Sequence, residues 1–274
     1  MDDRMAFGAY APSGVTGWVV DRTRLLPDTW TGRRTAFLLR RIASPFMRGV
    51  PVDVERLGAR MRLHPYNNIC ERRILFTPQY FDAEELAFLR GRIREDFVFI
   101  DGGANVGAYS LFVASQAGPR ARVVAVEPQP DIFDRLIYNI QQNPFGTIKA
   151  VACALADKTG ELTLFLDPRN SGESSVKIVG FNQAPTLRVP GTTLLDLITR
   201  EGFERVDAAK LDVEGAEDLI LEPFFASAPR ALYPAVLILA NTPSRWQADL
   251  TGLVEAQGYR RVGETKSNLI FELA

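Results

Sequence analysis

The sequence predicts an α/β protein built on a mostly parallel β-sheet with helices on both faces. After residue 96, short apolar runs alternate with longer amphipathic runs, which is the pattern of successive βαβ units. A glycine-rich turn follows the first strand-like run, and two strand-like runs close the chain as a hairpin. Such a hairpin adds an antiparallel edge to an otherwise parallel sheet.

Hydrophobic period and boundary residues identify each element of this sheet. β-Branched residues dominate the strand-like runs, and apolar residues at three- and four-residue spacing mark the helices. The first half comprises strand 97–100, helix 106–117, strand 122–126, helix 131–142 and strand 147–151. The second half comprises a half-exposed strand 161–167, a helix at 192–199, strands ending "AAKLDV" and "PAVLILA", a helical stretch 243–257, and the terminal hairpin.

The first 95 residues have weaker patterns and predict an extension before the sheet domain of 96–274. Residues 1–34 are rich in Gly, Pro, Thr and Arg and predict a loosely structured arm. A short helix is expected over 35–43 and a β-hairpin over 51–65, where polar and apolar residues alternate. Asp82 is the expected N-cap of a further helix leading into the sheet.

The composition is that of an ordinary globular chain. Of 274 residues, 46% are hydrophobic and 24% charged, with a formal net charge of −1. A core of this size needs no disulfide or metal to stabilise it. The two cysteines, Cys70 and Cys153, form no disulfide or metal-binding pattern. No signal peptide is evident, and no apolar run reaches the ~20 residues of a membrane span. We therefore expect a cytoplasmic location.

Histidine and arginine are unevenly used, and both constrain function. A serine triad needs a histidine base and most zinc sites need several His or Cys ligands, so with His64 as the single histidine we expect neither site. Residues 1–96 hold 16 Arg, no Lys and 12 acidic residues. This basic segment indicates either contact with an anionic substrate, partner or membrane, or a solvated surface. The arginines are not interleaved with aromatics in a nucleic-acid-binding pattern, so no nucleic-acid partner is expected.

The turn after the first strand reads "FIDGGANVGAYSL" and favours a cationic ligand over a phosphate. A dinucleotide-binding turn has the spacing G-x-G-x-x-G, whereas Ala104 replaces the middle glycine here. Asp101 precedes the glycines and would repel a pyrophosphate. The turn also lacks the lysine of a phosphate-binding loop. Gly103 and Gly107 allow close backbone approach at this point.

Two more carboxylates follow the next strands. Glu127 ends the strand after Asp101 and is placed to accept both hydroxyls of a ribose. Asp157 follows the third strand and is placed to accept the amino group of an adenine. Because the ends of parallel strands meet at one edge of a sheet, the three carboxylates describe a cationic adenosyl ligand without phosphate. S-adenosylmethionine has these properties.

Five motifs then give the sequence a resemblance to the FkbM family of S-adenosylmethionine-dependent methyltransferases. They are "FIDGGANVGAYSL", "VVAVEPQPDIFDRLIYNIQQN", "ACALADKTGELTLFL", "SGESSV" and "AAKLDVEGAEDLIL", with a weaker match in "ILFTPQYFDAEELAFLR". The resemblance implies a Rossmann-like class I methyltransferase fold, with a seven-stranded sheet and an antiparallel last strand. It also implies methyl transfer, usually to a hydroxyl oxygen of a sugar, polysaccharide or other natural product.

The resemblance also assigns roles to individual residues. Glu127 binds the ribose and Asp157 lies near the adenine, while Asp212 and Glu214 of the "DVEG" motif face the transferred methyl. A glutamate common in the family after the next strand is replaced here within "LILAN", by Ala240 or Asn241. The methionine part of the cofactor is surrounded by the turn residues Asp101, Gly103, Asn105 and Gly107.

An alcohol is a poor nucleophile at neutral pH, so a general base is expected. Asp212 is the first candidate, Glu214 the second, and Lys210 the third if burial lowers its pKa. The two acids could also bind a divalent cation, but no third ligand is obvious. The polar loop 167–185, with Ser174 and Ser175, is a candidate acceptor-recognition segment. Each of these residues could instead be structural, as a helix cap, an ion pair or an exposed loop.

Two other functions remain open from the sequence. The chain could bind S-adenosylmethionine without catalysis, or, less consistently with Asp101 and Ala104, be a nicotinamide-dependent oxidoreductase. The expected partner is a hydroxylated small molecule or glycan, and the N-terminal segment could mediate a homodimer.

Overall fold

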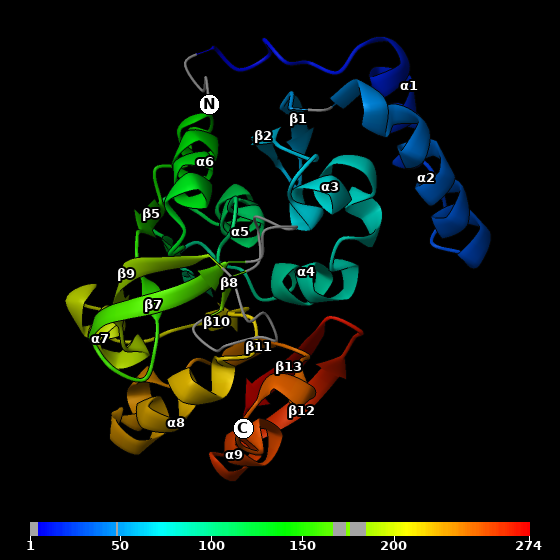
Figure 1. The fold of residues 1–274 in the computed structure, drawn as a ribbon. Coiled ribbons are helices and arrows are strands. Elements are labelled where there is room, and N and C mark those ends of the chain that lie inside the picture. The colour runs from blue at the N-terminus through cyan, green and yellow to red at the C-terminus, as the bar shows by residue number, and fades with distance from the viewer. Residues whose placement is uncertain (1–4, 48, 167–173, 176–184) are drawn as a thin grey trace.

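A computed structural model describes residues 5–47, 49–166, 174–175 and 185–274 (Figure 1). Within them, the central sheet has the order β12-β13-β11-β10-β3-β4-β5. Neighbouring strands from β5 to β11 are parallel, β13 is antiparallel to β11, and β12 is antiparallel to β13. This is the predicted mostly parallel seven-stranded sheet with an antiparallel terminal hairpin. The strands are β3 (Val98–Gly102), β4 (Arg122–Val126), β5 (Ile148–Val151), β10 (Ala208–Leu211), β11 (Val236–Ala240), β12 (Tyr259–Glu264) and β13 (Asn268–Leu273).

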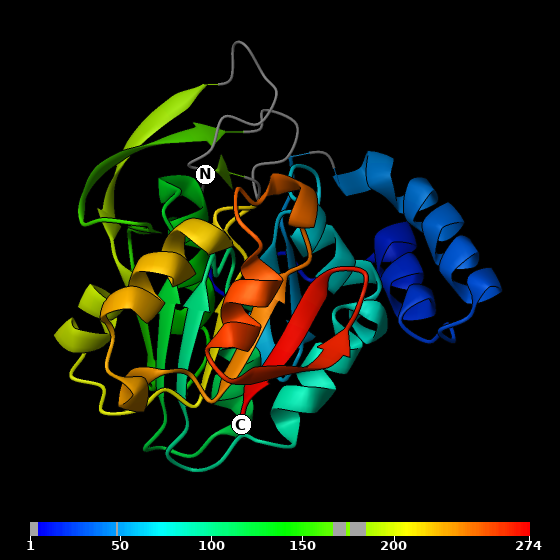
Figure 2. The ribbon, with the colours of Figure 1, turned by 90° about the horizontal axis from the view of Figure 1, so that it is seen from below.

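Helices cover both faces of this sheet (Figures 1 and 2). One face is covered by α4 (Ala83–Arg90), α5 (Ala108–Gln116) and α6 (Pro130–Gln141), and the other by α7 (Leu194–Arg200), α8 (Glu217–Ser227) and α9 (Leu250–Ala256). Strand β3 shows the division: Phe99 belongs to the first hydrophobic cluster, and Val98 and Ile100 belong to the second. Alternate side chains of a strand point to opposite faces, so each face of β3 is buried in its own core.

Two helices differ from the sequence prediction. The expected helix 243–257 is a 3₁₀ turn at Pro243–Arg245 followed by α9. Helix α9 begins late because the side chain of Asp249 caps it, accepting the backbone N–H of Gly252. Helix α8 was not expected, and it contains Pro223 in its interior. Its apolar side chains are nevertheless buried in the second cluster, and this packing overrides the local signal.

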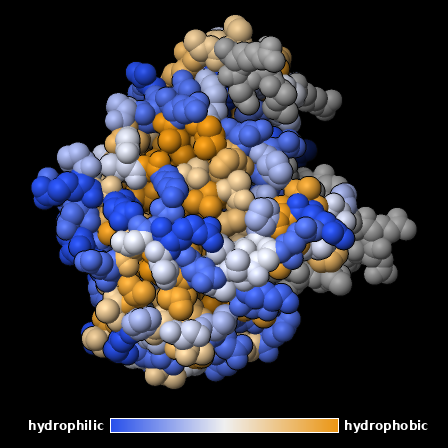
Figure 3. Space-filling view, turned by 90° about the vertical axis from the view of Figure 1, so that its left-hand side faces the viewer, coloured by the Kyte–Doolittle hydropathy of each residue, from blue (hydrophilic) through white to orange (hydrophobic). Residues whose placement is uncertain are grey.

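A smaller sheet with the order β6-β9-β7-β8 lies beside the β5 side of the central sheet. Its strands are β6 (Ala154–Leu155), β7 (Gly160–Leu166), β8 (Ser174–Ser175) and β9 (Thr186–Thr192). Only β7 was expected. The predicted acceptor loop 167–185 falls almost entirely outside the described residues. Figure 3 views this side of the molecule, where hydrophobic patches are separated by hydrophilic side chains.

The N-terminal segment is more ordered than predicted. The expected arm contains α1 (Gly14–Thr23), and α2 (Trp30–Ala43) begins before the predicted helix. The sequence signal of α1 is weak because it contains two glycines and two threonines, but its packing on α2 buries Val19 and Val20. The predicted hairpin is confirmed as β1 (Val52–Arg56) and β2 (Ala59–Leu63), and an unpredicted helix, α3 (Ile69–Phe76), follows it.

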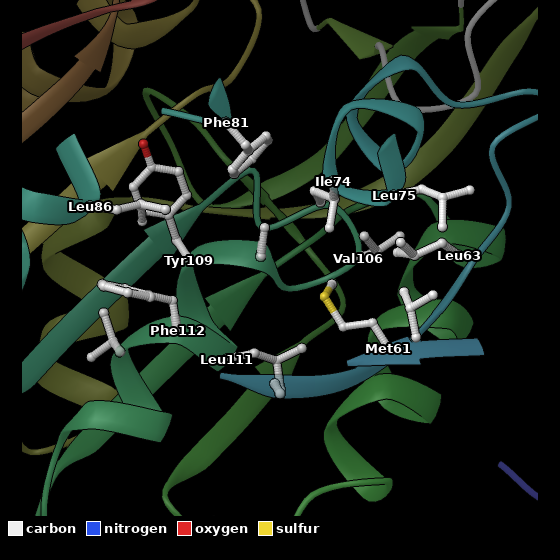
Figure 4. Packing of buried hydrophobic residues seen from close by; sticks show 14 of the residues in the cluster. Met61, Leu63, Ile74, Leu75, Phe81, Leu86, Val106, Tyr109, Leu111 and Phe112 are labelled. Carbon is white, nitrogen blue, oxygen red and sulfur yellow. The ribbon is translucent and has the colours of Figure 1, made fainter. Parts of the chain in front are cut away.

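The hairpin and α3 share one hydrophobic core with the sheet domain. Met61 and Leu63 of β2 point toward Val106, which precedes α5, and Leu111, which lies in α5 (Figure 4). Ile74 and Leu75 of α3 belong to the same cluster. This cluster crosses the predicted boundary after residue 95. No helix in the described part of the chain is long and apolar enough to cross a membrane.

Candidate active site

Carboxylate residues end three neighbouring strands of the central sheet. Asp101 lies in β3, Glu127 directly follows β4, and Asp212 directly follows β10. The chain runs from β3 outward through β4 to β5, then returns to β10 on the other side of β3. This reversal of strand order is where α/β sheets form ligand-binding crevices. Asp101 and Glu127 thus end neighbouring strands as the sequence predicted, and the third carboxylate at this crevice is Asp212 in place of Asp157.

The glycine turn between β3 and α5 is fixed by contacts with protein. Gly103 has a φ of +77°, and a Cβ there would overlap the backbone carbonyl oxygen of Asp212. Gly107 has a φ of +91°, and its Cβ would lie 2.7 Å from Leu136 Cδ1. Both glycines are thus required by packing, and not only by the approach of a ligand. Gly103 also lines the hollow described next, whereas Gly107 does not.

A first hollow opens between the ends of β3, β4 and β10. Its walls combine apolar side chains with the carboxylate of Glu127. Asp157 is exposed and does not line the hollow, so the structure does not place it near Glu127. The lining residues are Gly103, Asn105, Val126, Glu127, Pro128, Cys153, Ala154, Leu155, Leu164, Asp212, Val213 and Glu214.

Glu127 is oriented toward this hollow by backbone donors. Its Oε2 accepts the N–H of Asn105 and its Oε1 accepts the N–H of Gln129, both at 2.9 Å. Asn105 has a φ of +51°, which is unusual for a residue other than glycine and turns its N–H toward the carboxylate. The side chain of Glu127 is buried, and burial raises its pKa to about 7 although the two N–H bonds act to lower it.

A second hollow adjoins the first and shares Gly103, Asn105, Asp212 and Glu214 with it. It is strongly charged, with both acidic and basic side chains on its walls. Residues from α3 and the following turn form one side, and these were not among the predicted site residues. Besides the shared four, the lining residues are Asn68, Ile69, Cys70, Arg73, Phe81, Asp82, Asp101, Ala104, Ala108, Tyr109 and Lys210.

The charged groups of the second hollow form a chain of contacts. Arg73 Nη2 donates to Asp82 Oδ1 at 2.9 Å, and the hydroxyl of Tyr109 donates to Asp82 Oδ2 at 3.0 Å. The Tyr109 ring lies 4.8 Å from Lys210 Nζ, which donates to Asp212 Oδ2 at 2.9 Å. Asp82 is the N-cap residue of α4, as predicted, but its carboxylate makes these contacts and accepts no capping hydrogen bond from the helix. The only sequence signal for this side was the weak motif "ILFTPQYFDAEELAFLR".

Lys210 does not meet the condition set for it as a base, which was a pKa lowered by burial. Burial alone would lower its pKa, but the neighbouring carboxylates of Asp212 and Asp101 outweigh burial, and the pKa is raised. The side chain therefore stays protonated at neutral pH and cannot accept a proton from an alcohol. Lys210 lies opposite Asp101 in the β10–β3 register, so its ammonium pairs with Asp212 and also acts electrostatically on Asp101.

Asp101 is buried at the floor of the second hollow. Its Oδ2 accepts the backbone N–H of Ser110 at 3.0 Å and the Ser110 hydroxyl at 2.6 Å. Burial raises the pKa of Asp101, while Lys210 and Ser110 oppose that shift. The carboxylate thus both binds the first turn of α5 and contributes to the hollow.

Other predicted residues lie as follows. Glu214 lines both hollows, has a φ of +57°, and pairs with Arg245 Nη1 at 2.6 Å.

His64 lies outside the linings of both hollows. It is buried, and its Nδ1 is 3.4 Å from a carboxylate oxygen of Glu71. Asn241 bonds across the terminal hairpin to Thr265 and lines neither hollow. In the described part of the chain, no three His, Cys, Asp or Glu side chains gather as a metal site would require.

The sheet order and the two adjoining hollows define a Rossmann-like α/β protein with a two-part ligand site at the strand ends. The chain belongs to the FkbM methyltransferase family, whose family model, described as "Methyltransferase FkbM domain", matches residues 101–249. Its cofactor is S-adenosylmethionine. The donor set fits this molecule: a buried carboxylate with apolar walls suits an adenosine, and the acidic junction of the hollows suits a sulfonium and an ammonium.

Three curated proteins are similar to parts of this chain. Methyltransferase sdnD of Sordaria araneosa is 26% identical over 196 residues, covering 53% of this chain and 75% of that protein. Hexuronic acid methyltransferase AglP of Haloferax volcanii is 27% identical over 142 residues, covering 52% of this chain and 55% of that protein. AMB antimetabolite synthetase AmbE of Pseudomonas aeruginosa is 56% identical over 162 residues, covering 46% of this chain and 8% of that protein.

Solved structures with a similar fold are more distant. A Geobacter sulfurreducens methyltransferase is 15% identical, with a TM-score of 0.43, and the match covers 94% of this chain and 95% of that one. Aeropyrum pernix fibrillarin with bound S-adenosyl-L-methionine is 13% identical, with a TM-score of 0.41, covering 70% and 74%. These similarities are too low to support an argument about the site, and the fold class follows from the strand order of the chain itself.

Proposed function

We propose that this methyltransferase transfers the methyl group to a hydroxyl oxygen of a sugar, a polysaccharide or another hydroxylated natural product. The observation that carries the proposal is the junction of the two hollows at Asp212. The first hollow has the composition of an adenosine site. The second receives the methionine part beside Asp101 and extends toward Asn68 and Arg73, where the acceptor would bind. The name of the relative AglP, a hexuronic acid methyltransferase, supports a sugar acceptor.

In this proposal, Glu127 binds the ribose hydroxyls, and the apolar residues Val126, Pro128 and Leu155 contact the adenine. Asp101, Gly103 and Asn105 surround the methionine part. Asp157 is exposed and outside the lining of the first hollow, so the proposal gives it no contact with the adenine. When bound, S-adenosylmethionine supplies an electrophilic methyl on a sulfonium whose departure leaves a neutral thioether.

Asp212 is the proposed general base. Its side chain is 43% exposed, lines both hollows, and is oriented by Lys210. As the acceptor oxygen gains the methyl, its proton passes to the Asp212 carboxylate. Glu214 is the second candidate, but its carboxylate is already paired with Arg245. Alignment of the acceptor in the second hollow contributes the rest of the rate, because positioned reactants can lower a barrier by several kcal/mol, up to ~7–11.

The test is methylation of a panel of hydroxylated acceptors that includes hexuronic acids and their oligosaccharides. We expect S-adenosylhomocysteine release with one methyl on an acceptor oxygen, located by tandem mass spectrometry. Asp212→Asn should largely retain cofactor binding in calorimetry, with at most a modest loss because one acid of the junction is removed, and should lose turnover. Methyl found on nitrogen or carbon would overturn the O-methylation proposal, and full turnover of Asp212→Asn would remove the base assignment.

Two alternative functions predict different results. A binding protein without catalysis would bind S-adenosylmethionine and transfer no methyl to any acceptor. A nicotinamide-dependent oxidoreductase would be stabilised thermally by NAD and not by S-adenosylmethionine. We propose a cytoplasmic location, which is consistent with Cys70 and Cys153 being unpaired thiols.

A further inference from the structure

Helix α2 presents large apolar side chains and arginines on its outward face. Trp30 is 71% exposed, and Phe37, Leu38 and Ile42 are each about half exposed. The face toward α1 instead contains the small buried residues Gly32, Ala36 and Ala43. Helix α2 lies at the outer edge of the molecule in both ribbon views (Figures 1 and 2). A contiguous exposed apolar face of this kind marks an interaction site more often than an ordinary surface.

The charge on this helix is entirely positive. Its sequence contains four arginines and no acidic residue. Arg33 pairs with Asp28, but Arg34, Arg40 and Arg41 form no ion pair within the described residues. Their guanidinium groups lie against aromatic rings instead: Arg34 is 5.2 Å from the Trp30 ring, and Arg40 is 5.2 Å from the Phe37 ring.

At the inner edge of this face, two arginines act on one another. Burial and the positive charge of Arg72, in α3, lower the pKa of Arg40. Arg72 Nε is buried with no hydrogen-bond partner in the described part of the chain. Arg40 and Arg72 therefore add positive charge beside the outward face of α2.

We propose that the outward face of α2, defined by Trp30, Arg34, Phe37, Leu38, Arg41 and Ile42, is a docking site for an acidic segment of a partner protein. Carboxylates of the partner pair with the arginines, and its aliphatic side chains cover the exposed rings. Aromatic residues and arginine are the side chains enriched in protein interfaces and in their energetic centres. The proposal is independent of the methyl acceptor.

The distribution of side chains favours a protein over a lipid surface. A helix that lies on a membrane segregates its cations on one side and its apolar residues on the other. In α2 the arginines and the apolar residues share one side, and the opposite side packs on α1. Self-association through this face is also disfavoured, because pairing two copies of α2 would bring arginines together without any acid.

The docking face is firmly attached to the active site. Gln79 Nε2 donates to the carbonyl oxygens of Thr23 and Leu26, and the Tyr80 hydroxyl donates to that of Leu26 at 2.8 Å. These bonds hold the α1–α2 connection against the turn whose next residues, Phe81 and Asp82, line the second hollow. A partner bound to α2 is thus connected to the acceptor side of the site by rigid contacts.

The experiment uses the full chain and a synthetic probe. The probe is a helical peptide of about 18 residues with Leu at i, i+3, i+4 and i+7 spacing and Glu between. We expect it to bind the wild type, to shift tryptophan fluorescence to the blue, and to protect residues 30–46 from hydrogen exchange. The double variant Arg34→Glu/Arg41→Glu should weaken binding at least about tenfold, because it reverses two interface charges.

The control variant Arg260→Glu/Lys266→Glu makes the same charge change on exposed residues of the terminal hairpin and should bind the peptide like the wild type. A matched peptide with Lys in place of Glu should bind only the charge-reversed α2 variant. The proposal is overturned if the acidic peptide binds both double variants equally, or fails to bind the wild type. It is also overturned if phosphatidylglycerol vesicles protect α2 from hydrogen exchange and the peptide does not. A dimer in sedimentation, with α2 protected from hydrogen exchange in the absence of peptide, would overturn it as well.

Discussion

The ammonium of Lys210 and the carboxylate of Asp212 form a 2.9 Å hydrogen-bonded ion pair at the junction of the two hollows. The two ends differ in environment, since the Lys210 side chain is 4% exposed and that of Asp212 is 43% exposed. Lys210 also faces the buried Asp101 in register. A charge that is buried and shared between two acids orients the exposed partner, and this is the role that the structure gives Lys210 in place of the predicted base.

Replacing Lys210 by Met should lower both stability and methyl transfer. The variant leaves Asp101 buried without its cation, and breaking a buried pair in this way costs about 3 kcal/mol or more in unfolding free energy. Turnover should fall by roughly two orders of magnitude or more, because Asp212 is no longer oriented. Urea unfolding measures the first effect, and S-adenosylhomocysteine release measures the second.

Lys266→Met is the matched control for this variant. Lys266 is exposed, so its loss should change the unfolding free energy by less than about 1 kcal/mol. Equal stability of the two variants would show that Lys210 is not the buried counter-charge of Asp101. Retained turnover in Lys210→Met would show that Asp212 does not depend on Lys210 for its orientation.

Gly103 is expected to tolerate no side chain, because the turn and Asp212 touch there. Gly103→Ala must relieve both a φ of +77° and overlap with the Asp212 carbonyl oxygen. We expect a loss of about 3 kcal/mol or more in unfolding free energy, together with weaker cofactor binding as the Asp212 segment moves. Denaturant unfolding and calorimetry measure the two effects.

Gly146→Ala separates the steric effect from backbone strain. Gly146 has a similar φ of +65°, but nothing lies within 4 Å of a Cβ there. Its substitution should cost only about 1 kcal/mol and leave cofactor binding unchanged. If both alanine variants lose the same stability, the close packing on Asp212 is not the reason that position 103 requires glycine.

The central strands and the positions of their carboxylates could be predicted because their signals are local. Strand β4 matches the predicted range, and β3 differs from it by one or two residues. Asp101 and Glu127 follow from one rule, since parallel strands end at the same edge of a sheet, whereas Asp212 was indicated by the family motif. Asp157 was expected from the same rule, but β6 of the smaller sheet separates it from β5, so the rule does not apply to it.

The second hollow could not be predicted in the same way. Arg73, Asp82 and Tyr109 come from three segments whose contacts depend on how α3 and the hairpin pack on α5. Helix α1 has poor intrinsic propensity and forms because it packs on α2. In both cases tertiary contacts between distant residues decide the structure, and no pattern within a short window records them.

The buried pair of Asp53 and Arg62 should stabilise the N-terminal segment. Arg62 Nε donates to Asp53 Oδ1 at 2.7 Å with both side chains almost fully buried, and Asp53 also accepts the N–H groups of Gly8 and Tyr10. Asp53→Asn should therefore lower the unfolding free energy by about 3 to 5 kcal/mol at neutral pH. Asp28→Asn, at the exposed pair with Arg33, should change stability far less, because solvent screens that pair.

The pH dependence of this effect has a definite sign. Burial alone would raise the pKa of Asp53, but Arg62 and the two backbone N–H groups outweigh burial, and the pKa is lowered. A lowered native pKa gives stability that is complete above the unfolded value near ~4 and is lost as pH falls through the native value. The difference between wild type and Asp53→Asn in urea unfolding should be constant above about pH 4 and shrink below it. A difference that grows on acidification would contradict the ion pair.

Glu127 should give the opposite pH dependence. Burial raises its pKa from an ordinary value of 4.5 to about 7. Between these values the folded state binds more protons than the unfolded state, so the stability of the wild type falls as pH rises, and the loss is complete above about pH 7. Glu127→Gln cannot ionise. The unfolding free energy of the variant minus that of the wild type should therefore increase by about 3 kcal/mol from pH 4.5 to 7.

Ionisation of Glu127, which lowers the stability of the folded protein, should strengthen cofactor binding. Ribose hydroxyls donate to a carboxylate more strongly than to a carboxylic acid, so S-adenosylmethionine affinity should rise with pH through about 7. Calorimetry should show this rise in the wild type and a flat, weaker affinity in Glu127→Gln. Glu204→Gln removes one exposed carboxylate and controls for net charge. An affinity that rises equally in Glu127→Gln would assign the ionisation to another group, and an unchanged affinity in that variant would remove Glu127 from the ribose.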